Sequence, residues 1–302
     1  MASKGVSLPL TAENTSSVMR VTIFNVSYSQ AEKWQKDPLE KEENFLIISA
    51  FEQLLNNKLS ASSTASRING IVSPRLISGL RASVGCIWGL FADATKHFGT
   101  SHTQQLAGVI TAIRELPDVV NEKGYKVIRS GKMLWRGMPE FGWIFAEHGV
   151  QINGTDGMTY DEWHSQEEEL LNATVLVATL MQRGGSFGIG MMYHAHDAFN
   201  EIELPFDDER EMADEWKMYI PPAEAWMSIA GEKLFGLCFD KSVIHSAEPH
   251  ESLRKAFNTD RWALWKQRFA GLAEQEDIDE RCRGLARKAV EKMREIEQRA
   301  QL

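Results

Sequence analysis

Cysteine, basic residues and long apolar runs are all scarce in this chain of 302 residues. Its three cysteines, Cys86, Cys238 and Cys282, show no zinc-site spacing and cannot all pair, which favours a reducing compartment. Lys and Arg total 33 against 42 Asp and Glu, so the formal charge of −9 argues against nucleic-acid binding. No uncharged apolar run reaches the roughly 18 residues that a membrane span needs. We therefore expect a cytoplasmic protein with no membrane span and no nucleic-acid partner.

Strand-like alternation of apolar and polar residues is also nearly absent, whereas helical spacing of apolar residues recurs along most of the chain. Residues 60–66 are predicted to form a polar loop, and 131–157 a connection rich in Gly and Pro. The predicted helices cover residues 38–59, 74–91, 101–116, 161–182, 188–203, 221–234, 260–272 and 277–298. The prediction is an all-α fold: a single-domain multi-helix bundle over residues 31–302, preceded by a flexible arm over 1–30.

The segment 160–204 is the element around which the rest of the chain is expected to be organised. It contains two helical runs separated by Gly184 and Gly185. Glycine at such a break suits a tight reversal, because the left-handed backbone after a helix excludes most side chains. The sequence therefore predicts a central helical hairpin.

Four oxygen-bearing side chains lie at matching heights on the two arms of this hairpin. Glu169 and Asn172 share a face of the first arm, and Asp197 and Glu201 share a face of the second. If these faces turn toward each other, the four side chains converge on one site. Acids on amphipathic helices are more often solvated or ion-paired, so each residue competes with a purely structural role.

Five stretches of the sequence, taken in their order along the chain, resemble a known family. They are Trp135 to Trp143, Asn172 to Leu180, His196-Asp-Ala-Phe-Asn-Glu201, Pro222-Ala-Glu-Ala-Trp226 to Leu234, and Arg261-Trp-Ala-Leu-Trp-Lys-Gln-Arg-Phe269. The chain resembles the fungal OpdG-like family of secondary-metabolite gene clusters, over roughly residues 70–297. The family is in turn distantly similar to the atypical humulene synthases of fungal tropolone sesquiterpenoid pathways. Only the stretch beginning at Arg261 is specific by itself.

The resemblance implies a magnesium-dependent sesquiterpene cyclase-like lyase that acts on a prenyl diphosphate such as farnesyl diphosphate. Such chemistry needs Mg²⁺ on carboxylates, cations on the leaving phosphate and an aromatic pocket that stabilises a carbocation. The candidate Mg²⁺ ligands are Glu169, Asn172, Asp197 and Glu201. The candidate catalytic residues are Lys266, Arg261, Asp197 and Glu201, with Arg268 as a further phosphate partner. The candidate substrate-pocket residues are Trp226, Trp262 and Phe199.

Other motifs give weaker signals. Asp161-x₃-Ser165-x₃-Glu169 and Asp207-Asp208-x₂-Glu211 have the spacing of terpene-cyclase metal motifs, but in reversed order along the chain. The pattern His194-x-His196-x₄-Glu201 imitates a cupin metal motif, yet a cupin needs a β-barrel, and two histidines two residues apart diverge on a helix.

Two alternative functions stay open beside the cyclase. One is a metal-free cyclase or isomerase that folds a biosynthetic intermediate in an apolar pocket, with Asp197 or Glu201 as acid or base. The other is a non-catalytic pathway protein that binds a metabolite. For all three functions the expected partner is an apolar small molecule. If the protein is a cyclase, this molecule carries a diphosphate. A homodimer is left open.

Overall fold

The structure is a computed structural model that describes residues 38–78, 84–147, 160–184, 187–203, 212–239 and 256–300. These ranges are almost entirely helical, and the only strands in them are β1 (Ile128–Arg129) and β2 (Lys132–Met133). The predicted all-α class is therefore confirmed. The predicted N-terminal arm lies outside the described residues. No helix within those ranges combines the length and apolar character that crossing a bilayer requires.

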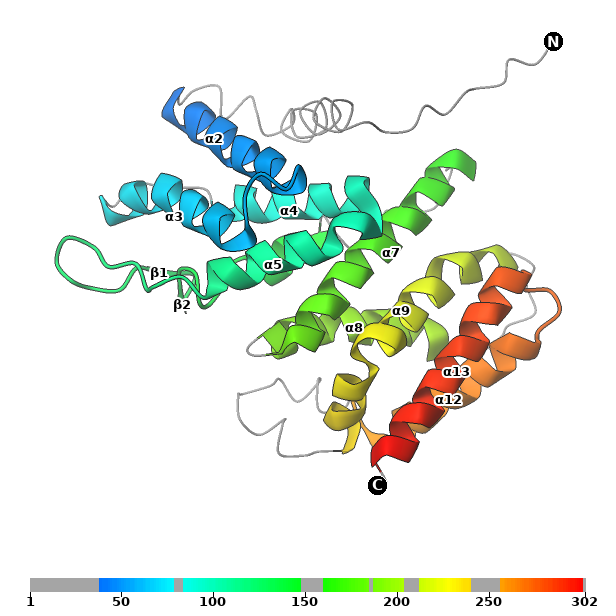
Figure 1. Cartoon of the computed structure of the whole chain (residues 1–302). Coiled ribbons are helices and arrows are strands. Elements are labelled where there is room, and N and C mark those ends of the chain that lie inside the picture. Colours follow the sequence, from blue (N-terminus) through cyan, green and yellow to red (C-terminus); the bar gives the residue numbers. More distant parts are fainter. Residues whose placement is uncertain are drawn as a thin grey trace, which may run out of the picture. The chain divides into compact units, whose positions relative to one another are not determined.

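The helices follow one another along the chain as Figure 1 shows, in colours from blue to red. They are α2 (Pro38–Leu55), α3 (Ala61–Ile77), α4 (Val84–Phe98), the 3₁₀ helix η1 (Gly99–His102), α5 (Thr103–Arg114), α6 (Phe141–Phe145), α7 (Tyr160–Arg183), α8 (Phe187–Glu203), α9 (Met212–Phe239), α12 (Thr259–Glu274) and α13 (Glu280–Ala300). The chain divides into two compact units, the first within 1–94 and 108–141 and the second within 95–107 and 142–302. The single domain over 31–302 stays a prediction.

The first unit is built on aromatic packing between helices. Phe51 of α2 meets Phe91 of α4 edge-on, with ring centroids 4.5 Å apart. Trp88 of α4 is fully buried, and its indole N–H donates to the carbonyl oxygen of Pro139 at 2.8 Å. Phe141 packs edge-on against the Trp88 ring at 5.1 Å. One tryptophan therefore attaches the connection that follows β2 to the helices of this unit.

Helix α3 occupies the region where the sequence predicted a loop at 60–66 and a new helix starting at Ser73-Pro74. Both predictions are wrong. Ser60 caps α3, because its hydroxyl accepts a hydrogen bond from the backbone N–H of Ser63 at 3.1 Å. The helix then continues through Pro74, which lies in its last turn. A proline there costs one intrahelical hydrogen bond near an end that is about to terminate. The serine at position 60, a residue that commonly caps helices, is the sequence signal for the start of α3.

The short connection from 128 to 145 contains structure that its Gly and Pro content did not predict. Strands β1 and β2 pair antiparallel through Ile128 with Met133 and Arg129 with Lys132. The two residues between them, Ser130 and Gly131, both have positive φ, 48° and 74°, as a tight two-residue hairpin turn requires.

Gly137 is expected to be the glycine least tolerant of substitution among those described in the first unit. A Cβ built there lies 2.8 Å from the Met133 carbonyl oxygen and 2.7 Å from the Cβ of Lys132, so neither neighbour can swing away. We expect Gly137→Ala to lower the free energy of unfolding by about 2 kcal/mol. Gly89→Ala is the matched control: its Cβ meets nothing within 4 Å on helix α4, so it should raise stability by about 0.5 kcal/mol. Urea denaturation of both variants measures the difference, and equal stabilities would refute the clash.

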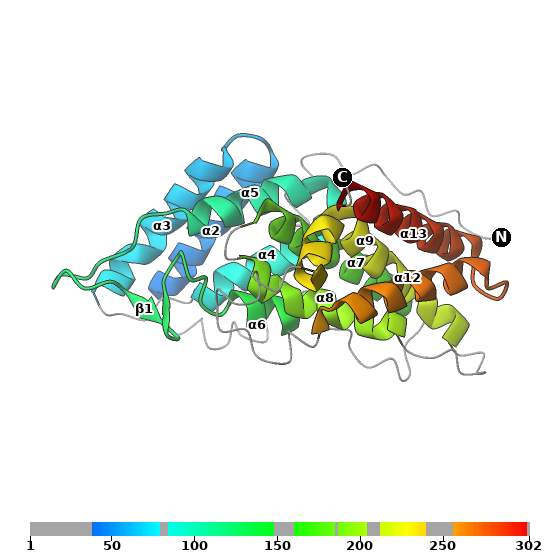
Figure 2. The same cartoon turned by 90° about the horizontal axis from the view of Figure 1, so that it is seen from below.

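The second unit contains the predicted hairpin. Helices α7 and α8 pack against each other on either side of Gly184, whose φ is +83°. Helix α9 packs on both, and α12 and α13 lie side by side against α9, as the two views in Figures 1 and 2 agree. The helical hairpin is confirmed, and it lies among the other helices of this unit.

Helix α9 begins earlier than predicted. The prolines at 221 and 222 were expected to open the helix, but it already begins at Met212 and continues through both. Trp216, Met218 and Ile220 are buried on the turns before the prolines. Burial of these side chains favours helical continuation, which outweighs the loss of two backbone donors.

Candidate functional site

The most specific sequence motif, on α12, binds two carboxylates. The guanidinium of Arg261 donates to Glu203 Oε1 at 2.6 Å and to Asn200 Oδ1 at 2.7 Å, both on α8. The indole N–H of Trp265 donates to the same Glu203 oxygen, and Arg268 donates to the Glu203 backbone carbonyl at 2.9 Å. Three motif residues thus attach α12 to the end of α8.

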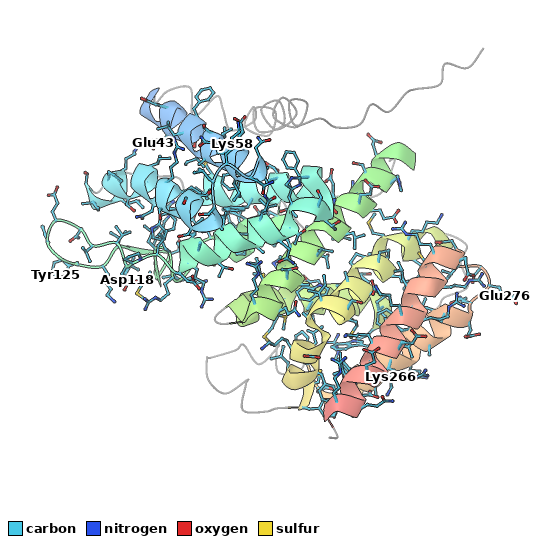
Figure 3. All side chains as sticks on the ribbon, in the orientation of Figure 1. Glu43, Lys58, Asp118, Tyr125, Lys266 and Glu276 are labelled. Carbon is cyan, nitrogen blue, oxygen red and sulfur yellow. The ribbon has the colours of Figure 1, made fainter. Side chains whose placement is uncertain are left out.

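Two further residues of the motif, Lys266 and Trp262, bind Glu297 on α13. Lys266 Nζ lies 2.7 Å from both Glu297 carboxylate oxygens, and the Trp262 indole N–H donates to one of them at 2.8 Å. Partial burial alone would raise the pKa of Glu297, but the hydrogen bonds from Lys266 and Trp262 outweigh it and the pKa is lowered. Figure 3 labels Lys266 beside α13. The Lys266–Glu297 pair therefore joins α12 to α13.

These contacts bear on the predicted phosphate-binding roles of Arg261 and Lys266. Both cations are already paired with a carboxylate, so a diphosphate would have to displace Glu203 or Glu297. The predicted pocket residues Trp262, Phe199 and Trp226 are each at most 1% exposed. Phe199 stacks on the motif's second tryptophan, Trp265, at 4.3 Å. In the described part of the chain these aromatics belong to the packed core, and their role toward a substrate stays a prediction.

Glu169 and Asn172, the predicted ligands on α7, contact the connection between α4 and α5. The Glu169 carboxylate lies 3.4 Å from Lys96 Nζ, and the Asn172 amide donates to the Lys96 carbonyl oxygen at 3.3 Å. Gly99 lies beside Asn172: a Cβ built on the glycine would be 3.5 Å from the amide. Both side chains therefore stabilise the turn that contains η1.

Asp197 and Glu201 are the predicted ligands on α8, the other arm of the hairpin. The Asp197 side chain is 74% exposed, with His196 Nδ1 3.4 Å away. No group of three or more His, Cys, Asp or Glu side chains that could hold a metal occurs among the described residues. In the structure Asp197 is turned to solvent and Glu169 to Lys96, and the use of these side chains as Mg²⁺ ligands stays a prediction. The second metal-motif candidate, Asp207 with Asp208, lies outside the described residues.

His194 appears in the sequence only as part of the cupin-like pattern, but the structure gives it a position of its own. It lies on α8 and is only 6% exposed, between the buried Met191 and Ala195. Neither ring nitrogen has a hydrogen-bond partner in the part of the chain that is described. Burial lowers the pKa of His194 to about 4, against a smaller opposing effect of Asp197. The imidazole is therefore neutral at pH 7, and one nitrogen is left as a free base.

Trp226 on α9 has a second buried polar atom without a partner. Its side chain is fully buried, and the indole N–H makes no hydrogen bond within the described ranges. Helices α8 and α9 pack against each other, so His194 and Trp226 belong to the same group of helices. A buried unpaired donor or base costs about 1–3 kcal/mol, so each such group calls for an explanation. The signal in the sequence was that His194 lies on the apolar stripe of its helix, three residues after Met191.

The cysteines do not offer a nucleophile in this region. Burial raises the pKa of Cys238 to about 12 and that of Cys282 to about 12. A thiol with such a pKa stays protonated at neutral pH, and the thiolate is the reactive form. His194 is therefore the better candidate for chemistry among the buried groups.

Comparison with known proteins locates the chain in one family. No curated protein and no solved structure matches it. A family model described as "Protein of unknown function (DUF3632)" matches residues 88–269, which include α7, α8, α9 and most of α12. The match covers more than half of the chain, and this protein therefore belongs to the DUF3632 family.

Proposed function

We propose that this protein is a biosynthetic isomerase or cyclase that uses His194 as a general base on an apolar small molecule. The observation that carries the proposal is the buried, neutral imidazole of His194, whose two nitrogens have no partner among the described residues. Strongly perturbed titratable groups with no structural partner are typical of catalytic sites. His194 takes the place of Asp197 as the base, because the Asp197 carboxylate is exposed, and Glu201 stays the alternative base that the sequence suggested.

The chemistry that suits these groups is the movement of a proton beside a carbonyl. His194 would accept the proton from a carbon next to the carbonyl. The same imidazolium then returns the proton to another carbon, so the product is an isomer of the substrate. The apolar side chains of α8 favour the neutral base and an apolar substrate. No divalent ion is needed for this proton transfer.

The proposal is tested by deuterium uptake. Purified protein is incubated in D₂O with a set of apolar linear and cyclic enones, and deuterium incorporation is followed by mass spectrometry. We expect His194→Gln to slow incorporation by about 100-fold or more, the usual contribution of a general base. His196→Gln is the matched control on the same helix, since its ring is partly exposed, and it should keep the wild-type rate. Equal rates in the two variants would end the proposal.

A second candidate function is the magnesium-dependent sesquiterpene cyclase-like lyase. It is supported by the resemblance to the fungal OpdG-like family and to the atypical humulene synthases. The candidate Mg²⁺ ligands do not fit the ion as they stand, because Glu169 is paired with Lys96 and Asp197 faces solvent. Farnesyl diphosphate incubated with the protein, with Mg²⁺ or with EDTA, distinguishes the two. Magnesium-dependent hydrocarbon products in gas chromatography, without deuterium uptake by any enone, would favour this candidate over the base.

A further inference from the structure

His194 becomes a cation in the reaction proposed for it, and that cation has no hydrogen-bond partner among the described residues. The ring is 6% exposed on α8, and both of its nitrogens are enclosed within the protein. A buried charge without a partner is costly, so the imidazolium that forms when His194 takes a proton needs an opposite charge nearby. Such a charge would lower the barrier to proton transfer, because it stabilises the cation more than the neutral base.

Asp197 lies three residues after His194 on α8, almost one turn further along the helix. Side chains at this spacing are neighbours on a helix surface, with about 5–6 Å between their Cβ atoms. Their environments differ, because His194 is buried whereas 74% of the Asp197 side chain is exposed. The carboxylate is therefore solvated, and it belongs to the turn that follows a ring that is not.

The electrostatic effect of Asp197 reaches this imidazole. Burial lowers the pKa of His194 to about 4, and the Asp197 carboxylate opposes this by stabilising the protonated ring. Helices α7, α9 and α12 pack against α8, yet within the described ranges no charged residue on them acts on the pKa of His194. In that part of the chain the electrostatic partner of the imidazolium is therefore on its own helix.

We propose that Asp197 is a positioning residue that acts through His194: its carboxylate stabilises the imidazolium that forms during proton transfer and so makes His194 a stronger base. This inference rests on the general-base role proposed for His194, and it gives Asp197 a part in the reaction without contact with the substrate. Because the carboxylate is exposed, its effect should be moderate and should weaken as salt screens it. The rate would then depend on ionic strength even for an uncharged substrate.

The first test compares Asp197→Asn with Asp197→Glu in the deuterium-uptake assay at pH 7. His194 is neutral at this pH, so the rate reports the strength of the base and not the fraction of it that is available. We expect Asp197→Asn to slow uptake about threefold, the size of effect that an exposed charge exerts on a neighbour. Asp197→Glu keeps the charge and should restore most of the rate.

Salt supplies a readout that a purely structural role of Asp197 would not change. Salt at about 1 M should slow the wild-type protein by a similar factor and leave the rate of Asp197→Asn unchanged. Glu291→Gln is the matched control, since it removes an exposed carboxylate from α13, and it should keep both the wild-type rate and the wild-type response to salt. An equal response to salt in Asp197→Asn and the wild-type protein would contradict the inference.

Nitrogen NMR of the His194 imidazole tests the electrostatic step without any substrate. Asp197→Asn should lower the proton affinity of the ring about threefold, so that it protonates at a lower pH than in the wild-type protein. The same midpoint in both proteins would overturn the inference, and so would a wild-type uptake rate in Asp197→Asn while His194→Gln is slow. If His194→Gln itself keeps the wild-type rate, the general-base function fails first, whatever the midpoint, and the role of Asp197 fails with it.

Discussion

Replacing Trp265 with alanine is expected to lower the free energy of unfolding by about 4 kcal/mol. The side chain is fully buried on α12 and stacks on Phe199 with ring centroids 4.3 Å apart. It also meets Phe257 edge-on at 6.0 Å, and its indole N–H donates to Glu203. Alanine would leave a cavity between α8 and α12 and remove a hydrogen bond from the carboxylate that binds Arg261. Urea denaturation followed by circular dichroism measures the loss.

Two further tryptophan variants separate the cavity from the hydrogen bond. Trp265→Phe keeps a ring in the core but loses the donor to Glu203, so we expect a loss of about 1–2 kcal/mol beyond its smaller size effect. Trp143→Ala is the surface control, because that side chain is 63% exposed, and it should change stability by less than about 0.5 kcal/mol. If Trp265→Ala unfolds at the same urea concentration as Trp143→Ala, the aromatic contacts of α12 do not stabilise the fold as described.

Acidification from pH 6.5 to pH 4 is expected to destabilise the protein through His194 by up to about 3 kcal/mol. Burial lowers the folded-state pKa of His194 to about 4, whereas an unfolded histidine titrates near 6.5. Between these values the unfolded chain takes up a proton that the folded chain does not. Stability therefore falls as the pH falls through this window.

The variant His194→Gln separates this effect from other acid-induced losses. It removes the titrating group, so its stability should change less between pH 6.5 and 4.5 than that of the wild-type protein. Glu297 and Asp279, whose pKa values are lowered, lose their stabilising contribution only at more acidic pH, below the ordinary carboxylate pKa. Parallel slopes for the wild-type protein and His194→Gln would mean that His194 titrates normally, and nitrogen NMR of the imidazole would then show it protonated at pH 6.

Much of the helical fold could be predicted from local patterns, and the errors fall where tertiary contacts override them. The α7–α8 hairpin follows from apolar spacing and from Gly184, both local signals. The start of α9 does not, because Trp216 and its neighbours are buried against other helices and keep the chain helical before Pro221. Strands β1 and β2 are two residues each, too short for alternation to be visible.

The candidate site was harder to predict because the sequence does not show how far each helix is rotated about its own axis, and therefore which side chains of neighbouring helices face each other. Asn172 and Asp197 stand at similar heights on the hairpin, but only the three-dimensional packing shows that one donates to the Lys96 carbonyl oxygen and the other faces solvent. The motif at Arg261 was specific, yet its partners Glu203 and Glu297 lie 58 residues before Arg261 and 31 residues after Lys266. Pairing over such separations is invisible to any local pattern. The sequence did not mark His194 as a candidate base, because a histidine on the apolar stripe of a helix is usually part of the core.

The two carboxylates that bind α12 also impose an order on the chain as it is synthesised. Glu203 is made before Arg261 and Trp265, so α12 can dock on α8 as soon as it emerges. Glu297 follows Lys266 by 31 residues, which at 5–20 residues per second takes roughly two to six seconds. During that interval Lys266 and Trp262 have no carboxylate from α13, and the α13-facing side of α12 is uncovered. We therefore expect the nascent second unit to pass through a stage in which α12 is docked on α8 but not yet on α13.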